Sequence, residues 1–131
     1  MKRTQTGFTM IELIVVIVIL GVLAATALPK FVNVQENAEE AALKGVAGSM
    51  ASAMSVNYGG CLVVNHANTA GKCQAVDNCS DVASLLQGNA VPTGYTVTAG
   101  ALTRGVSTAC TVTQTSSSAT ATFDGIGAGT P

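Results

Sequence analysis

The sequence predicts an α+β protein in which a long N-terminal helix, its hydrophobic half protruding, packs on a small, disulfide-stapled, antiparallel C-terminal sheet. Three observations predict this class. Apolar side chains dominate Phe8–Leu28, an amphipathic pattern follows Pro29, and short alternating Thr-rich stretches accompany four cysteines toward the C-terminus. At 131 residues, there is room for one small domain beyond the apolar run.

The N-terminal run is long enough to cross a membrane. Met1–Gly7 is a short basic leader, and the 21 residues of Phe8–Leu28 would form a helix about 31 Å long. Four interpretations compete: a cleaved signal peptide, a permanent anchor, a buried core helix, and a segment that first spans and then assembles. Ala25-Thr26-Ala27 resembles a conventional cleavage site, which keeps the first open. The remaining chain could not cover a core helix that is apolar all round.

Glu12 distinguishes these interpretations best. A carboxylate inside an apolar helix costs about 2.5–3.5 kcal/mol near the bilayer centre and less near the interface, so it indicates a function and calls for a cationic partner. No Lys or Arg lies on the neighbouring turns. Cleavage after Gly7 would create an α-ammonium four residues before Glu12, and the two charges could then pair between displaced copies of the chain.

The segment Gly7–Leu13, which reads GFTMIEL, resembles the type III signal of type IV prepilins and the related pseudopilins. The resemblance implies that a prepilin peptidase cuts after Gly7 and methylates Phe8, and that Glu12 carries the pairing between subunits. Gly21 and Pro29 fall in register with those pilins, and the basic leader is of the type IVa kind. The resemblance covers about the first 55 residues and is only architectural afterward.

This assigns residues 1–7 to a leader, 8–29 to a membrane-spanning and filament-core helix, and 30–131 to an amphipathic helix with a globular head. Pro29 should kink the helix or open it locally. The resemblance implies that Gly21–Pro29 loses helical structure when the chain packs into a filament; a simple kink is the alternative.

Beyond Pro29 the predicted helix presents an apolar row at four-residue steps, and it should end near Tyr58-Gly59-Gly60. The methionines in this row are expected to fill the core. The row consists of Val34, Ala38, Ala42, Val46, Met50, Met54 and Tyr58.

The rest of the head should begin with a loop, followed by a short helix over Asp81–Gln87 that is capped by Ser80 or Asp81 and stopped by Gly88. Alternating stretches near 95–98, 111–113 and 120–123 predict three or four antiparallel strands, with a hairpin connection over 114–118.

The even number of cysteines in a chain with an export-type N-terminus predicts disulfides and an oxidising compartment. Four cysteines allow three pairings, and the sequence does not choose among them. We expect Cys61–Cys73, closing a local loop, and Cys79–Cys110, tying the short helix to the sheet. The second pair is similar to the disulfide that bounds a C-terminal surface region in many type IV pilins.

No pattern indicates catalysis, a cofactor, a metal or a small-molecule substrate. His66 is expected to be solvated, and Asp77 with Asp81 makes a poor calcium site. Asn78-Cys79-Ser80 matches a glycosylation sequon, which is weak evidence by itself. The hydroxyls of 113–122 could accept O-linked sugar, although a plain exposed strand and turn is the favoured explanation. With charged residues at 10% and a net charge of −1, the composition shows nothing like the clustered Lys and Arg of a nucleic-acid-binding surface.

Three functions remain in competition. The first is a type IV pilin, most simply a major subunit, that starts in the inner membrane, is matured by the prepilin peptidase and is built by the assembly machinery into an extracellular homopolymeric filament. The resemblance implies adhesion, twitching motility or DNA uptake. The second is a pseudopilin of type II secretion. The third is a periplasmic, disulfide-stapled binding domain released by a conventional signal peptide.

Overall fold

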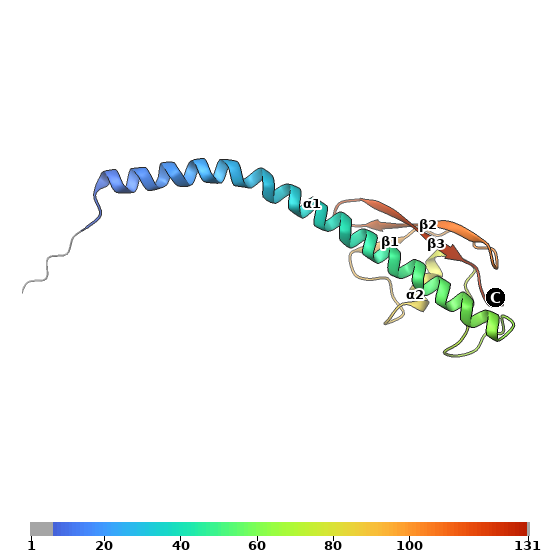
Figure 1. Cartoon of the computed structure of the whole chain (residues 1–131). Helices are drawn as coiled ribbons and strands as arrows, with labels where there is room; N and C mark the ends of the chain where they lie inside the picture. The colour runs from blue at the N-terminus through green and yellow to red at the C-terminus, as the bar shows by residue number, and fades with distance from the viewer. Residues whose placement is uncertain (1–6, 131) are drawn as a thin grey trace, which may run out of the picture. The chain divides into compact units, whose positions relative to one another are not determined.

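The computed structural model describes residues 7–130, so most of the basic leader lies outside the described residues. Helix α1 spans Met10–Val63, followed by the short helices η1 (Cys79–Asp81) and α2 (Val82–Leu85). Three strands follow: β1 (Tyr95–Val97), β2 (Ser107–Gln114) and β3 (Thr120–Ile126) (Figure 1). The chain divides into two compact units, one up to Ala38 and one from Glu39 onward.

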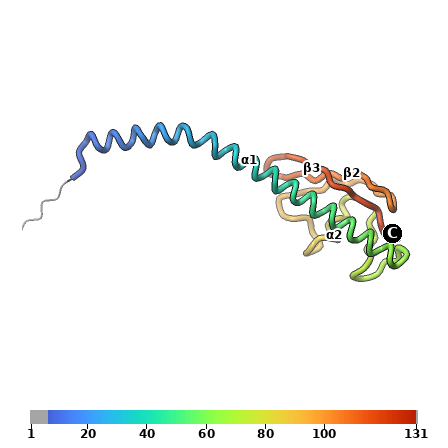
Figure 2. Tube along the Cα trace, in the orientation of Figure 1, coloured from blue at the N-terminus to red at the C-terminus, as the bar shows by residue number. Residues whose placement is uncertain are grey.

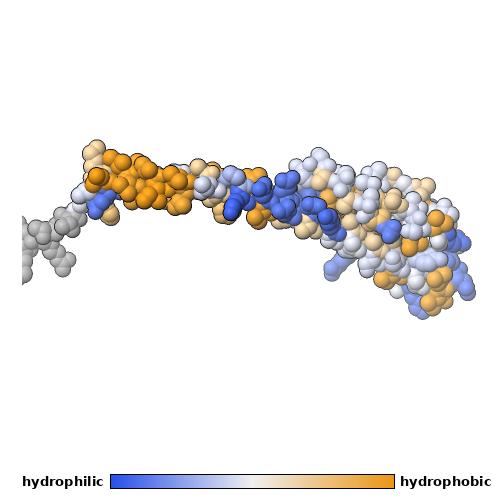
Figure 3. Space-filling view, turned by 45° about the horizontal axis from the view of Figure 1, so that its top comes forward, coloured by the Kyte–Doolittle hydropathy of each residue, from blue (hydrophilic) through white to orange (hydrophobic). Residues whose placement is uncertain are grey.

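The first unit consists of the N-terminal part of α1, and its large apolar side chains are exposed (Figure 3). By length and composition α1 is the one helix among the described residues that could cross a membrane, and its most apolar window has no buried residue. The helix is continuous through Gly21 and Pro29. The expectation that Pro29 opens the helix locally is therefore wrong for the single subunit.

The second unit contains a three-stranded antiparallel sheet in the order β1-β2-β3, within the range of three or four strands that the sequence predicts. The residues of β2 alternate: Cys110, Val112 and Gln114 are buried, and the side chains between them lie on the other face. On that outer face threonines stand next to one another across the strands, with Thr113 opposite both Thr96 and Thr120. Strand alternation therefore separates an apolar inner face from a hydroxyl-rich outer face.

The core forms where the C-terminal part of α1 packs against the inner face of the sheet. Met50 and Met54 are fully buried among Val112 and Phe123, which confirms their predicted role. Val46 and Tyr58 are partly buried and pack against the core clusters, as expected. The first three residues of the row are wrong, because a strict four-residue step rotates about 40° per step around an α-helix. The buried positions instead alternate steps of four and three: Leu43, Ala47, Met50, Met54, Asn57 and Cys61, whereas Val34, Ala38 and Ala42 are exposed.

The predicted end of the helix near Gly59-Gly60 is also wrong, because α1 continues to Val63. Asn65 and His66 then take left-handed backbone conformations, and the His66 N–H donates to the Cys61 carbonyl at 2.7 Å, which closes the helix end. Gly60 has a different purpose. A Cβ there would collide with the Lys72 carbonyl oxygen, so this glycine allows the following loop to approach the helix closely.

The short helix is present, and Asp81 is the N-cap residue of α2 as one form of the prediction has it, but its side chain makes no capping hydrogen bond to that helix. Asn78 is the N-cap of η1: its side-chain oxygen accepts from the Ser80 N–H, while the Asp81 carboxylate accepts from the Asn78 N–H at 2.9 Å. The helical stretch that follows ends at Leu85 rather than Gln87. The hairpin between β2 and β3 is confirmed.

Both expected disulfides are present. Cys61–Cys73 joins Cα atoms 4.4 Å apart and Cys79–Cys110 joins Cα atoms 5.7 Å apart. The second lies in the main core, and the first anchors a smaller buried cluster with Ala128 near the end of α1. This places the end of the chain beside the end of α1 within the second unit (Figure 2).

Candidate functional site

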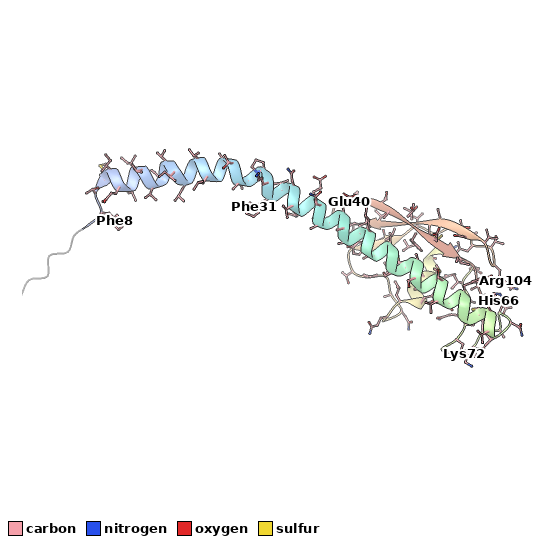
Figure 4. All side chains as sticks on the ribbon, in the orientation of Figure 1. Phe8, Phe31, Glu40, His66, Lys72 and Arg104 are labelled. Carbon is pink, nitrogen blue, oxygen red and sulfur yellow. A yellow bond between two sulfur atoms is a disulfide. The ribbon has the colours of Figure 1, made fainter. Side chains whose placement is uncertain are left out.

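The predicted cleavage junction, Gly7–Phe8, lies before the first helical residue. Gly7, Phe8 and Thr9 have no regular secondary structure, and α1 begins at Met10. The Phe8 side chain is 91% exposed, and nothing lies within 4 Å of a Cβ built on Gly7. Figure 4 shows Phe8 ahead of the helix. No described residue covers the junction between these two residues, so it is accessible to a peptidase.

Glu12 takes part in a capping box with Thr9, which the sequence analysis missed. The Glu12 Oε2 accepts hydrogen bonds from the Thr9 N–H and from Thr9 Oγ1, both at 2.8 Å, and the Glu12 N–H donates to Thr9 Oγ1 at 3.4 Å. The pattern Thr-x-x-Glu before an apolar run is the signal that could have identified it. The acid therefore begins the helix, and one of its oxygens is occupied within its own chain.

The third polar side chain of the apolar run is also hydrogen-bonded internally. Thr26 Oγ1 donates to the Leu23 carbonyl at 3.0 Å and lies 3.4 Å from that of Val22. Thr9, Glu12 and Thr26 are the only three polar side chains in Phe8–Leu28, and each is hydrogen-bonded within that segment. Because polar groups without partners are costly in lipid, this segment suits an apolar environment better than its composition alone indicates.

Gly21 and Pro29, the predicted weak points, lie in helical structure within the first unit. A Cβ on Gly21 would have no atom within 4 Å, so no close contact inside the subunit requires glycine there. Glycine in a helix interior costs about 1 kcal/mol relative to alanine, and proline removes one backbone donor. Any benefit of these two residues therefore comes from backbone properties or from contacts with other molecules.

A second charged group lies at the start of the second unit, where Lys44 Nζ is 2.6 Å from Glu40 Oε1. The hydrogen bond from Lys44 and its positive charge hold the pKa of Glu40 below its ordinary value. Both side chains are well exposed, at 70% and 61%, so water screens the pair and it adds little to stability.

The remaining polar candidates of the head serve the fold. His66 is not simply solvated as expected: its Nδ1 accepts from the Gly129 N–H at 3.4 Å, and its ring lies 5.7 Å from that of Tyr58. Asp81 accepts from the N–H groups of Asp77 and Asn78, so its carboxylate is used as a cap. Within residues 7–130, no three His, Cys, Asp or Glu side chains are grouped as a metal site would require.

Comparison with known proteins identifies the segment that carries these features. Residues 2–28 match the family model described as the prokaryotic N-terminal methylation motif. The type IV narrow pilus major component PilA5 of Thermus thermophilus is 44% identical over 50 residues, which are 38% of this chain and 43% of that protein. The type II secretion system core protein G of Pseudomonas aeruginosa is 42% identical over 53 residues, covering 40% of this chain and 37% of that one.

A third relative is the type IV major fimbrial protein FimA of Dichelobacter nodosus, 39% identical over 54 residues, or 41% of this chain and 35% of that protein. The matched segments thus span about two fifths of each relative. No solved structure matches the chain. The likeness is confined to part of the chain and is shared by pilus subunits and by secretion-system core proteins.

Proposed function

We propose that this chain, a member of the type IV pilin and pseudopilin family by its N-terminal methylation motif, is the structural subunit of an extracellular type IV pilus and not an enzyme. In this proposal the prepilin peptidase cuts between Gly7 and Phe8 and methylates the new terminus. The subunit then passes from the inner membrane into a helical homopolymer. The observation that carries the proposal is Glu12, an acid at the start of the apolar run, which forms no salt bridge with any residue of 7–130.

Cleavage supplies that cation. The α-ammonium of Phe8 would stand at the same end of the helix as Glu12, and a neighbour displaced along the filament axis brings the two together. The Thr9 capping box supports this arrangement. It engages Oε2 only, and Oε1 accepts no hydrogen bond from any residue of 7–130. One oxygen can therefore keep the helix capped while the other receives the neighbour's ammonium.

The apolar side chains of residues 8–34 provide the bulk of the interface. Lipid and neighbouring helices are equally apolar, so packing and paired polar groups, rather than the hydrophobic effect, favour the polymer over the membrane. Opening of Gly21–Pro29 in the filament belongs to the same proposal. Its support is that Gly21 occupies open space in the subunit, where alanine would make a stronger helix.

A pseudopilin of type II secretion is the second candidate, because core protein G matches the chain as well as the pilus subunits do. The two disulfides and the use of Asp81 as a helix cap favour the pilus over a calcium-binding pseudopilin. For the pilus itself, we propose adhesion, twitching motility or DNA uptake as the roles that such a filament would serve.

The charge of Glu12 can be tested apart from its cap. Glutamine can replace glutamate in a capping box, so Glu12→Gln keeps the cap and removes the charge, whereas Glu12→Ala removes both. We expect both variants to be inserted and processed but to yield few or no surface filaments. The matched control is Thr9→Val, which removes the hydroxyl from the cap, leaves the charge, and should still assemble.

Filaments sheared from cells and counted by electron microscopy give the readout, and mass spectrometry of the recovered protein gives its N-terminus. A chain starting at methylated Phe8 supports the family mechanism, whereas a start at Leu28 supports the periplasmic binding domain. Abundant normal filaments from Glu12→Gln, together with their loss in Thr9→Val, would show that Glu12 acts as a cap and would contradict the pairing mechanism.

A further inference from the structure

Two charged side chains just beyond the apolar run, Lys30 and Glu36, have no side-chain partner among the residues that the structure describes. Across residues 7–130 neither Lys30 nor Glu36 makes a side-chain hydrogen bond, and neither takes part in the salt bridge between Lys44 and Glu40. Both residues are exposed on α1 and belong to the first unit. A filament that buries this part of the helix would have to supply partners for both charges, or bury them unpaired at considerable cost.

The helix itself prevents the two from pairing. Residues six apart are separated by about 600° of rotation, or 240° around the axis, and only residues three or four apart are neighbours on a helix surface. The positions three and four residues from Lys30 are Ala27, Thr26, Asn33 and Val34, none of which is acidic. Lys30 therefore presents an uncompensated cation, whatever its rotamer.

Glu36 is in the opposite situation. The acidic residues nearest to it on the helix surface are Glu39 and Glu40, three and four positions later, so its own helix repels its charge. Lys44 is held by Glu40, with its Nζ 2.6 Å from Glu40 Oε1. Among residues 7–130, Glu36 itself thus has no cation paired with it, and a second copy of this chain carries such a cation at Lys30. Figure 3 shows the hydrophilic patch on α1 that follows the apolar surface.

The displacement required by the N-terminal pair brings these charges close together. If Phe8 of one copy is level with Glu12 of its neighbour, the copies are shifted by four residues, or about 6 Å along the helix. Because both copies have the same conformation, Lys30 of the first is then level with Val34 of the second. Glu36 of the second copy lies two residues, about 3 Å, farther along, which the flexible Lys side chain can reach.

We infer that Lys30 of one subunit pairs with Glu36 of the next in the filament, as a second charge pair in the same register as Phe8 with Glu12. The partner is a second copy of this chain, so the inference rests on the proposed function. Opening of Gly21–Pro29 would free the rotation of the segment that follows, so the faces of Lys30 and Glu36 need not match those of Phe8 and Glu12. The Phe8–Glu12 pair sets the displacement between neighbouring subunits along the filament axis. The Lys30–Glu36 pair disfavours any other displacement, because the opposite charges then no longer meet.

A competing role for Lys30 is to anchor the membrane interface, where lysines commonly place their ammonium group. The two roles predict different results for a charge exchange. An interface anchor requires a cation at position 30 and is indifferent to position 36. A charge pair requires opposite signs at the two positions, so it still forms when the two charges are exchanged.

The test uses the full-length chain expressed in cells, with filaments recovered by shearing. We expect Lys30→Glu and Glu36→Lys each to reduce filament yield by about tenfold, because each places like charges opposite one another. The double variant Lys30→Glu/Glu36→Lys should recover most of the wild-type yield. Membrane insertion and cleavage after Gly7 should be unchanged in all three, as measured by mass spectrometry of the membrane fraction.

The matched control is Lys30→Glu/Asp124→Lys, which has the same total charge as the double variant but places the new cation on β3. Asp124 is exposed, and its one side-chain hydrogen bond among residues 7–130 is the one it accepts from Ser107 Oγ at 3.2 Å, so the head should tolerate the change. This control should remain as defective as Lys30→Glu. Recovery in it, or failure of the exchanged pair to recover, would overturn the inference while wild-type filaments still uphold the proposed function.

A second measurement is independent of filament yield. A carbodiimide joins a carboxylate directly to an amine in contact with it, so treated wild-type filaments should contain a Lys30–Glu36 cross-linked peptide. Filaments grown from mixed light and heavy isotope-labelled subunits distinguish a link between copies from one within a copy. Absence of the mixed-isotope peptide in intact filaments would contradict the pairing, whereas absence of wild-type filaments would contradict the proposed function itself.

Discussion

Removing the Cys79–Cys110 disulfide should destabilise the head more than removing Cys61–Cys73. The perturbation is a pair of double variants, Cys79→Ala/Cys110→Ala and Cys61→Ala/Cys73→Ala, each of which leaves no unpaired thiol. All four sulfur-bearing side chains are at most 5% exposed, so the cavities left by substitution cost similar amounts in the two variants. The difference between them then reflects the length of chain that each bond closes.

The magnitude follows from the sequence separations. In the loop-entropy model, a separation of 12 residues corresponds to about 2.8 kcal/mol and one of 31 residues to about 3.7 kcal/mol. For a domain of this size, each kcal/mol shifts the melting temperature by about 4–8 °C. We therefore expect a loss of about 15–30 °C for Cys79→Ala/Cys110→Ala and a loss about one quarter smaller for the other variant.

Scanning calorimetry of the full chain in detergent micelles would measure both shifts against the wild type. The main core contains Cys79 and Cys110 beside Val82 and Val112, so their loss should lower the cooperative transition of the whole head. The smaller cluster around Cys61 lies at the end of α1, so removal of the Cys61–Cys73 disulfide should mainly broaden the thermal transition. A larger loss from the Cys61–Cys73 variant, or losses below about 1 kcal/mol from both, would refute the reasoning from loop length.

Two further predictions concern α1. Gly60→Ala should destabilise the head by about 1–3 kcal/mol, because its Cβ meets the Lys72 carbonyl oxygen, whereas Gly59→Ala, with no atom in the way, should be neutral or stabilising by up to about 1 kcal/mol in a thermal melt. Lys44→Gln should raise the pKa of Glu40 toward its ordinary value in an NMR titration. Because the pKa of Glu40 is lowered by folding, the pair with Lys44 adds a little to the stability of the folded state at neutral pH. This stabilisation is lost as the pH falls through the lowered pKa. If Lys44→Gln leaves the titration of Glu40 unchanged, the pair does not form in solution.

Features that depend on neighbouring residues in the sequence could be predicted. The apolar run, the basic leader and the position of Glu12 are linear patterns, and the family model matches residues 2–28 that contain them. Strand alternation placed the sheet correctly, because side chains of a strand alternate strictly between two faces. The capping box at Thr9 was equally visible in the sequence and was missed only because Glu12 was considered solely as a charge.

Features that depend on distant contacts could not be predicted. Asn57 is a buried polar residue whose side chain both donates to the Gln74 carbonyl and accepts from the Gln74 N–H, each at 2.9 Å, across 17 residues of sequence. Nothing in the helical pattern indicates such a partner. The helix ends later than predicted for a similar reason. Gly60 allows the close approach of the Lys72 backbone rather than ending the helix, and α1 continues to Val63.

Under the proposed function, the two oxygens of Glu12 would have different partners, which would let one acid serve in both membrane and filament. In the subunit Oε2 accepts two hydrogen bonds from Thr9, which reduces the cost of placing a carboxylate at the start of an apolar helix. Cleavage after Gly7 leaves Thr9 and its N–H in the chain, so the cap survives maturation. Transfer into a filament would then require only that Oε1 gain a neighbour's ammonium, without the loss of an existing bond. Under the proposed function, Oε1 would stay available for a correctly displaced copy, because no side chain of residues 7–130 donates a hydrogen bond to it.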